Sequence, residues 1–257
     1  MRIYLLVCLT ILIVENSTAI GDENLFKVEN NVAGKSAMDQ KLKNFIEGLK
    51  EMMKNGNKTL GVPRLDPFQS KPLDMAMNAD DFMGKFFTSS VSVEGLSNFI
   101  VNRATLKIVG LKMNISLEWP KIEGKILNYT ISDGRLMNFV NFFGHGSAKF
   151  LIQDIKFSIE MSVAVNTTTK FLFIKEVQTS ISIGDGKKND NIEFYTEGLY
   201  NDLELSQLFS GVISELAPAA FDTYYNQIIS TLNKLITDAG NKFLDKKTMK
   251  DLLTLVS

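Results

Sequence analysis

The sequence holds one cysteine and one histidine among its 257 residues, and neither stands in a context that indicates chemistry. Cys8 lies in an apolar N-terminal stretch, so the chain that follows it has no thiol and forms no disulfide. His145 stands between two glycines, where we interpret it as a turn residue rather than a catalytic base. With one histidine and no later cysteine, a soft-metal site is excluded, and we predict no metal and no cofactor.

An excess of positive charge is also absent. The 28 Lys and Arg residues are balanced by 29 Asp and Glu, and no basic cluster occurs that would bind nucleic acid. The sequence has no Gly-X-Ser-X-Gly nucleophile motif, no phosphate-binding loop and no calcium-loop pattern. We therefore predict that the protein is not an enzyme and has no nucleic-acid partner.

The N-terminal residues are typical of a secretory signal peptide. A positive start precedes an apolar stretch at 3–14, and small residues follow up to Ala19, the predicted cleavage position. That stretch is too short to span the roughly 30 Å of a bilayer, and no later stretch is long and uncharged enough. We expect a signal peptide at 1–19, a secreted, extracellular domain at 20–257, and no stable membrane insertion. In a secreted chain, four Asn-X-Ser/Thr triplets predict a glycoprotein modified at Asn57, Asn114, Asn128 and Asn166.

The mature chain begins with a helical pattern and then changes period. Apolar residues from Met38 to Met53 recur every three or four positions, and the helix is predicted to end at Asn55-Gly56-Asn57. From about Val91 to Thr196 the period is two, which indicates antiparallel strands with one apolar face. Turns are predicted at three glycine-containing segments: Ser132-Asp133-Gly134, Gly144-His145-Gly146 and Gly184-Asp185-Gly186.

The last quarter of the chain returns to helix. An apolar stripe from Leu205 to Leu216 is followed by Pro218, which is predicted to interrupt it, and by a longer stripe from Phe221 to Phe243. Strands and helices are therefore segregated, as in an α+β fold. The economical way to bury all the stripes is a curved antiparallel sheet wrapped around the long C-terminal helix.

Several sequence segments, in this order, resemble segments of one protein family. They are Leu60-Gly61-Val62-Pro63-Arg64-Leu65-Asp66-Pro67, Val93-Glu94-Gly95-Leu96-Ser97-Asn98-Phe99, Leu117-Glu118-Trp119-Pro120-Lys121-Ile122, Gly144-His145-Gly146 with Asp154, and the spacing from Glu197 to Leu216. The chain resembles the insect haemolymph juvenile-hormone-binding protein and takeout family over most of its length. More distantly it is similar to mite allergens and to the lipid-transfer domains of bactericidal/permeability-increasing protein.

The resemblance implies an elongated fold with a tunnel for one hydrophobic molecule, such as a terpenoid or a fatty acyl chain. One departure is a cysteine pair near the mature N-terminus, which is typical of the family and is missing here. Because the hormone carriers are among the cysteine-bearing members, the departure argues against juvenile hormone itself as the ligand.

The leading hypothesis is a carrier whose partner is a small hydrophobic ligand. The composition provides 18 Phe and 11 Met, which suit the wall of an apolar cavity but equally a filled core. The predicted ligand-facing residues are Phe45, Leu49, Met113, Ile115, Leu117, Phe157, Ile159, Met161, Phe171, Phe173, Ile181, Tyr225, Ile229 and Leu232. The alternative is a secreted protein with a filled core and no ligand, which binds an unidentified protein partner or a membrane surface.

Overall fold

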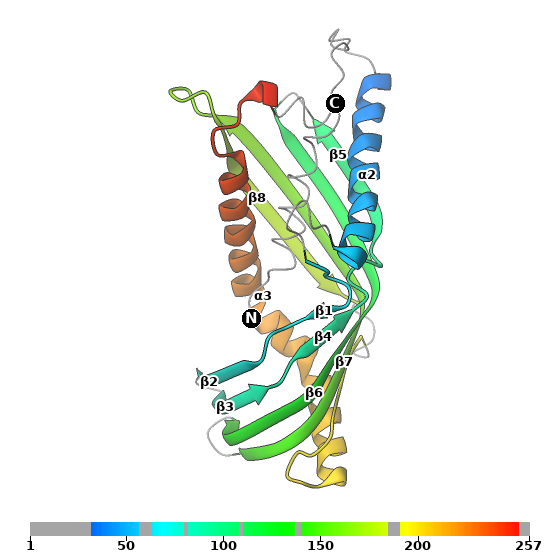
Figure 1. The fold of residues 1–257 in the computed structure, drawn as a ribbon, viewed down its shortest axis with the longest axis vertical. Coiled ribbons are helices and arrows are strands. Elements are labelled where there is room, and N and C mark those ends of the chain that lie inside the picture. Colours follow the sequence, from blue (N-terminus) through cyan, green and yellow to red (C-terminus); the bar gives the residue numbers. More distant parts are fainter. Residues whose placement is uncertain are drawn as a thin grey trace.

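The computed structural model describes residues 32–56, 63–79, 82–107, 110–136, 140–184 and 191–251. The predicted signal peptide, the triplet at Asn57 and the loop at 185–190 lie outside these residues. The elements are α2 (Val32–Asn55), β1 (Phe68–Gln69), β2 (Leu73–Ala79), β3 (Phe82–Thr88), β4 (Val91–Glu94), β5 (Ile100–Lys107), β6 (Lys112–Leu136), β7 (Val140–Val165), β8 (Leu172–Ile183), β9 (Ile192–Thr196) and α3 (Leu203–Leu244) (Figure 1). The predicted α+β order is confirmed, with β1 to β3 added before the first expected strand.

One long hairpin forms the middle of the sheet. β6 and β7 have 25 and 26 residues and pair antiparallel from Lys112↔Ser162 to Leu136↔Val140. In the upper half of the molecule as drawn in Figure 1, β5 pairs with the outer edge of β6, and β8 pairs with the outer edge of β7. In the lower half, β3 and β4 pair with β6, and β9 pairs with β7. The hairpin thus runs the length of the molecule, while the shorter strands change partners along it (Figure 1).

The change between the two halves occurs at Pro120 and Asp154. The register runs from Trp119↔Ile155 to Lys121↔Gln153, which leaves Pro120 opposite Asp154 without a pairing. Proline has no N–H to donate, and Asp154 has a left-handed backbone with φ 53°. The ladder is therefore interrupted at this point.

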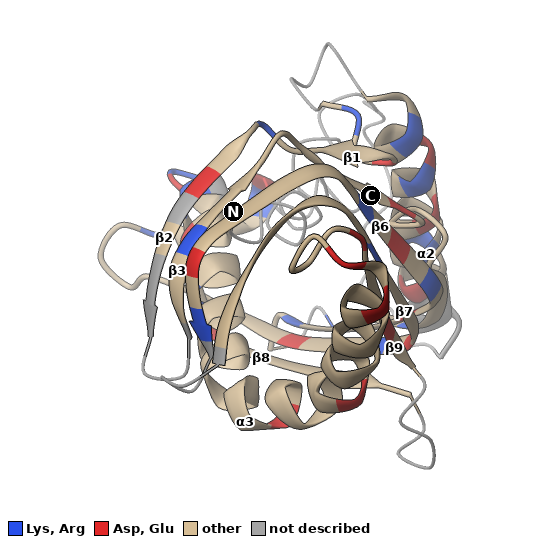
Figure 2. Ribbon diagram, turned by 90° about the horizontal axis from the view of Figure 1, so that it is seen from below, with Lys and Arg blue, Asp and Glu red and all other residues tan. Residues whose placement is uncertain are grey.

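Irregular pairing lower down adds further curvature. The β6–β7 register shifts between Ile126 and Tyr129 and again between Ile131 and Gly134. Each shift is a bulge, which bends and twists the strand. Seen from below, β2, β3, β6, β7 and α3 surround the long axis of the molecule (Figure 2). The predicted curvature of the sheet around the C-terminal helix is confirmed.

Two predicted turns are wrong, because both segments lie inside long strands. The segment around Asp133 is a bulge inside β6, and the segment around His145 lies within β7. The glycines of Gly144-His145-Gly146 serve a close approach instead. A Cβ atom on Gly144 would lie 2.3 Å from the carbonyl oxygen of Gly198, and one on Gly146 would lie 2.2 Å from that of Glu197. Only glycine allows the chain leading into α3 to pass so close to β7.

Among the described strands, β8 and β9 each pair only with β7, and helix α3 covers the edge that they leave free. The backbone N–H of Thr196 donates to Ser210 Oγ at 2.9 Å, and that of Phe194 donates to Ser214 Oγ at 2.7 Å. Higher up, the N–H of Ile174 donates to Asn241 Oδ1 at 2.7 Å. Polar side chains of one helix thus satisfy edge groups that would otherwise be open to pairing with another chain.

The predicted interruption of this helix is wrong. α3 is continuous over 42 residues with Pro218 inside it. Proline removes one intrahelical hydrogen bond and costs about 3 kcal/mol in a helix interior. Because α3 packs against β9 before this position and against β8 after it, contacts on both sides hold the helix together.

Helix α2 covers the opposite edge of the upper half. Asp39 Oδ1 accepts a hydrogen bond from the backbone N–H of Leu106 in β5 at 2.8 Å. The helix ends as predicted: Gly56 takes the left-handed conformation, φ 69°, and its N–H donates to the carbonyl oxygen of Met52 at 2.8 Å. The buried face of α2 is its predicted stripe, which packs against the sheet in the main hydrophobic cluster.

Candidate ligand-binding site

Three rows of side chains cross the inner face of the upper sheet. The register places Leu117, Phe157 and Ile181 in one row. The rows beside it are Ile115, Ile159 and Thr179, then Met113, Met161 and Val177. The structure thus brings together seven of the nine strand residues predicted to face the ligand, because their strands pair without a bulge over this stretch.

The exposure of these rows is graded. Ile115, Leu117, Phe157 and Ile159 are buried, whereas the outer members Met113, Met161 and Ile181 are only partly buried. The middle row contains one polar member, Thr179. Its hydroxyl donates to Asn233 Oδ1 of α3 at 2.8 Å, so the apolar face holds one hydrogen-bonded polar pair.

All five helical residues that were predicted to face the ligand are buried or partly buried. Leu49 and Leu232 are fully buried, at 0% and 2% exposure, and Phe45 packs against the same cluster as Leu49. Ile229 is half-buried. The fifth residue, Tyr225, is also half-buried, and its ring contacts Phe221 on the same helix rather than a strand, with centroids 5.9 Å apart.

Phe171 and Phe173 do not face the interior as predicted. Both are exposed, at 36% and 39%, while Leu172 and Ile174 face the interior in their place. The register of β7 with β8 runs from Ser162↔Glu176 to Val163↔Ile174, which leaves Lys175 without a partner. This single extra residue reverses the alternation of β8, so the phase that holds for Ile181 does not extend to the start of the strand.

The lower half holds a second interior cluster, which the sequence analysis did not predict. Tyr129, Ala148 and Leu199 are buried there, and partly buried apolar side chains surround them. The Tyr129 hydroxyl donates to the carbonyl oxygen of Glu197 and accepts from Thr196 Oγ1, both at 2.8 Å. Burial raises the pKa of Tyr129, and the hydrogen bond from Thr196 opposes that rise only in part.

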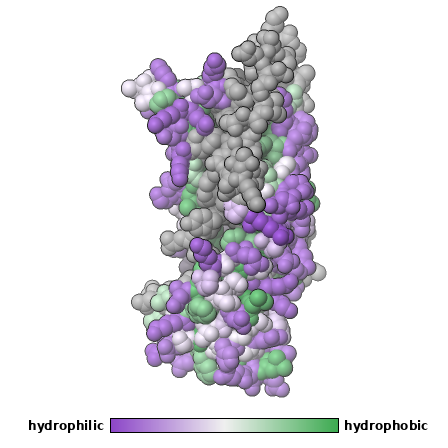
Figure 3. Space-filling view, in the orientation of Figure 1, coloured by the Kyte–Doolittle hydropathy of each residue, from purple (hydrophilic) through white to green (hydrophobic). Residues whose placement is uncertain are grey.

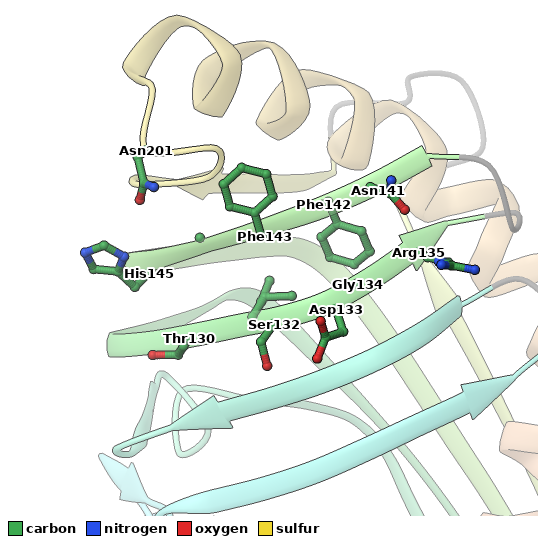
Figure 4. A pocket seen from close by; sticks show the side chains of 12 residues that line it. Thr130, Ser132, Asp133, Gly134, Arg135, Asn141, Phe142, Phe143, His145 and Asn201 are labelled. Carbon is green, nitrogen blue, oxygen red and sulfur yellow. The ribbon is translucent and has the colours of Figure 1, made fainter.

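An open cleft of about 640 Å³ lies at the lower end of the hairpin. The rings of Phe142 and Phe143 lie in its middle, with Arg135 toward one end and His145 toward the other (Figure 4). The remaining lining residues are Thr130, Ile131, Ser132, Asp133, Gly134, Asn141, Gly144 and Asn201. The volume is in the range of small-molecule sites, and the lining combines aromatic rings with hydrogen-bonding groups. The adjacent phenylalanines between two glycine segments are the sequence signal that would have located it.

Three of the five sequence segments that carry the family resemblance lie together at the lower end of α2. The Asp66 carboxylate accepts from the N–H of Gly95 at 3.0 Å and from the N–H of Ser97 at 2.8 Å, and the Ser97 hydroxyl also donates to it. Trp119 Nε1 donates to the carbonyl oxygen of Leu96 at 2.8 Å. Three sequence phrases therefore form one hydrogen-bonded junction. Its role is structural, since it ties the segment after α2 to the sheet where β6 reaches Pro120.

The described glycosylation triplets differ in the availability of their side chains. Asn128 and Asn166 are exposed. Asn166 Oδ1 accepts the N–H groups of Thr168 and Thr169, which leaves its amide nitrogen directed away from the turn. Asn114 is half-buried, and its amide nitrogen donates to Glu160 Oε1 at 2.7 Å.

Among the residues that the structure describes, no three His, Cys, Asp or Glu side chains gather where a metal ion would bind. The same part of the chain contains no helix long and apolar enough to cross a membrane.

Comparison with known proteins agrees with this architecture. Residues 7–254 match the family model of haemolymph juvenile hormone binding protein (JHBP). The fold is similar to the crystal structure of Epiphyas postvittana Takeout 1, with a TM-score of 0.54 and 16% identity over 88% of this chain and 96% of that chain. Lipopolysaccharide binding protein aligns with a TM-score of 0.34 and 13% identity over 85% of this chain and 39% of that one. No curated protein matches the sequence.

Proposed function

This chain belongs to the haemolymph juvenile hormone binding protein family, whose members bind hydrophobic ligands, and we propose that it is a secreted carrier of one small hydrophobic molecule. The proposed binding surface is the concave inner face of the sheet between α2 and α3. The ligand is a terpenoid, a fatty acid or a similar lipid, and the protein provides an apolar enclosure rather than a catalytic group.

The observation that carries the proposal is the set of three cross-strand rows on β6, β7 and β8. Their centre is buried, whereas Met113, Met161 and Ile181 at their margins keep part of their apolar surface accessible. An apolar ligand that covers this surface gains about 25 cal/mol per Å² removed from water. Methionine suits such a wall because its unbranched side chain adapts to differently shaped ligands.

One polar pair gives the ligand an orientation. Thr179 donates its hydroxyl hydrogen to Asn233 Oδ1, and the amide nitrogen of Asn233 adds a donor group at the same place on the inner face. A ligand with a carbonyl, ester or carboxylate oxygen would place that oxygen here and its hydrocarbon along the three rows.

Secretion, glycosylation and the lack of catalysis belong to the same proposal. The N-terminal sequence supports export, and exposed Asn128 and Asn166 suit modification in the secretory pathway. The alternative remains a filled core with no ligand, whose function lies on the surface.

The decisive experiment is native mass spectrometry of the protein from a eukaryotic secretion host, followed by organic extraction of what it carries. We expect a discrete lipid or terpenoid adduct. The variant Met161→Trp places a larger side chain on the inner face and should reduce the adduct, whereas Phe173→Trp on the exposed face of β8 should not. An empty protein that also binds no fatty acid or terpenoid would instead support the filled core.

A further inference from the structure

The first half of α3 has its small polar face inside and its apolar face outside. Ser206 and Ser210 are buried against the chain segment at 196–202 and the β9 edge. On the other side of the helix, Leu208 and Leu216 are 62% and 51% exposed. A surface helix normally buries its apolar stripe and exposes its polar one, so the arrangement is reversed here.

The exposed aliphatic side chains form one patch, which we call the leucine patch. It comprises Leu205, Leu208, Val212 and Leu216, which helical spacing places on one stripe away from Ser206 and Ser210. α3 begins at the lower end of the elongated molecule (Figure 1), and hydrophobic side chains are visible there among hydrophilic ones (Figure 3). Contiguous apolar surface of this kind marks an interaction site in a protein that circulates in water. A convex helix at the tip of the molecule meets a flat surface without obstruction from the rest of the fold.

From this patch we propose that the lower tip of the protein docks on an electrically neutral lipid surface. The patch is purely aliphatic and contains no Tyr, Trp or Arg, the residues that dominate binding energy at protein–protein interfaces. Leucine is one of the apolar side chains with which interfacial helices enter the outer part of a bilayer.

The charges beside the patch select the kind of lipid. Asp202, Glu204 and Glu215 flank it, and α3 carries no Lys or Arg before Lys234. An anionic bilayer would repel these carboxylates, whereas a zwitterionic one would not. A second copy is disfavoured by the same charges, because antiparallel pairing centred on the patch brings Glu204 of each copy near Glu215 of the other. The mixed face of Lys234, Asp238 and Lys242 belongs to the upper part of the helix.

The leucine patch lies next to the cleft, so docking affects where the cleft lies relative to the bilayer. Asn201 lines the cleft and lies four residues before Leu205, and Phe143 of the cleft is also exposed, at 47%. A tip held on a bilayer by the leucine patch therefore brings the cleft close to that bilayer. The docking itself goes beyond the proposed carrier function and does not depend on it.

The test is flotation with vesicles of phosphatidylcholine alone and with vesicles that also contain phosphatidylserine. We expect wild type to bind the neutral vesicles and to bind less when phosphatidylserine is added. Leu208→Gln should weaken binding about tenfold and Leu208→Gln with Leu216→Gln about a hundredfold, since burial of each leucine accounts for about one factor of ten. Leu127→Gln is the matched control, because Leu127 is 66% exposed but lies on β6 outside the patch.

Circular dichroism and the retained adduct in native mass spectrometry show whether each variant is folded and still carries its ligand, so that failure of docking and failure of the carrier proposal are distinguishable. Wild type that does not float with neutral vesicles would overturn the docking proposal. So would binding that increases with phosphatidylserine, or binding that Leu208→Gln with Leu216→Gln leaves unchanged. Self-association that this double variant abolishes, without vesicle binding, would also overturn it and assign the patch to a second copy.

Discussion

The carboxylate of Asp66 accepts hydrogen bonds from both the backbone N–H and the hydroxyl of Ser97, 31 residues further along the chain. The same carboxylate accepts from the N–H of Gly95, so one side chain satisfies three donors of a turn. Leu65 beside it is buried, and its N–H donates to the last turn of α2 at the carbonyl oxygen of Met53, 2.8 Å away. Asp66 therefore connects the end of α2 to the sheet.

Replacing this carboxylate should destabilise the fold. Hydrogen bonds to a charged group contribute about 1.5–3 kcal/mol each, and the contributions of neighbouring bonds do not add fully. We expect Asp66→Ala to lower the free energy of unfolding by about 3 kcal/mol in urea denaturation. Asp74→Ala, at an exposed position in β2, should change it by less than about 0.5 kcal/mol. Equal stability of the two variants would contradict the role of this junction.

The glycine that lets the chain pass β7 should not tolerate a side chain. A Cβ atom on Gly198 would lie 1.9 Å from the carbonyl oxygen of His145, and its φ is +81°. Backbone strain and overpacking together predict a loss of about 3 kcal/mol for Gly198→Ala, measured by thermal unfolding. Gly48→Ala is the control: nothing lies within 4 Å of its Cβ position on α2, and alanine should stabilise the helix by about 0.5–1 kcal/mol.

The attachment of α3 to the sheet edge should depend on Ser210. Removal of its hydroxyl in Ser210→Ala leaves the buried N–H of Thr196 without an acceptor, at a cost of about 1–3 kcal/mol. Hydrogen exchange of the Thr196 amide should then accelerate. Thr223→Ala, which removes an exposed hydroxyl bonded only within α3 to the carbonyl oxygen of Ala219, should leave that amide protected. Unchanged exchange in Ser210→Ala would indicate that packing alone holds the edge.

The buried hydroxyl of Tyr129 should make stability depend on alkaline pH. Burial raises its pKa above the ordinary value of 10.0, so the folded protein keeps a proton that the unfolded chain releases. The contribution is complete below pH 10 and is lost as pH rises through the folded pKa. Denaturation between pH 9 and 11 should show stability falling more steeply in wild type than in Tyr129→Phe. A residual slope will remain in the variant, because burial also raises the pKa of Tyr200.

Glycosylation should follow the availability of each asparagine amide. Asn128 and Asn166 are exposed, whereas the Asn114 nitrogen is bonded to Glu160 on a neighbouring strand. Glycopeptide mass spectrometry of secreted protein should therefore find higher occupancy at Asn128 and Asn166 than at Asn114. Glu160→Ala removes the acceptor of the Asn114 amide and should raise the occupancy at Asn114 toward that of Asn128 and Asn166. Full occupancy at Asn114 in wild type would contradict the expectation.

Patterns along the chain determined which side chains share a face wherever an element is regular. The period of three and four residues identified the buried stripe of α2, and strict alternation identified the inner residues from Met113 to Trp119 and from Ile155 to Met161. These faces follow from backbone geometry alone, because a helix repeats every 3.6 residues and a strand every two.

Tertiary structure decided the features that depend on an interrupted pattern or a distant partner. The unpaired Lys175 turned Phe171 and Phe173 outward, and contacts with β9 and β8 kept α3 continuous through Pro218. Only folding brought Asp66 to Ser97, and only the serine contacts with the β9 edge turned Leu208 toward solvent. In the first half of α3, periodicity shows an apolar side, but the other side is buried because its serines bond to groups of another segment, whose positions the local sequence does not contain.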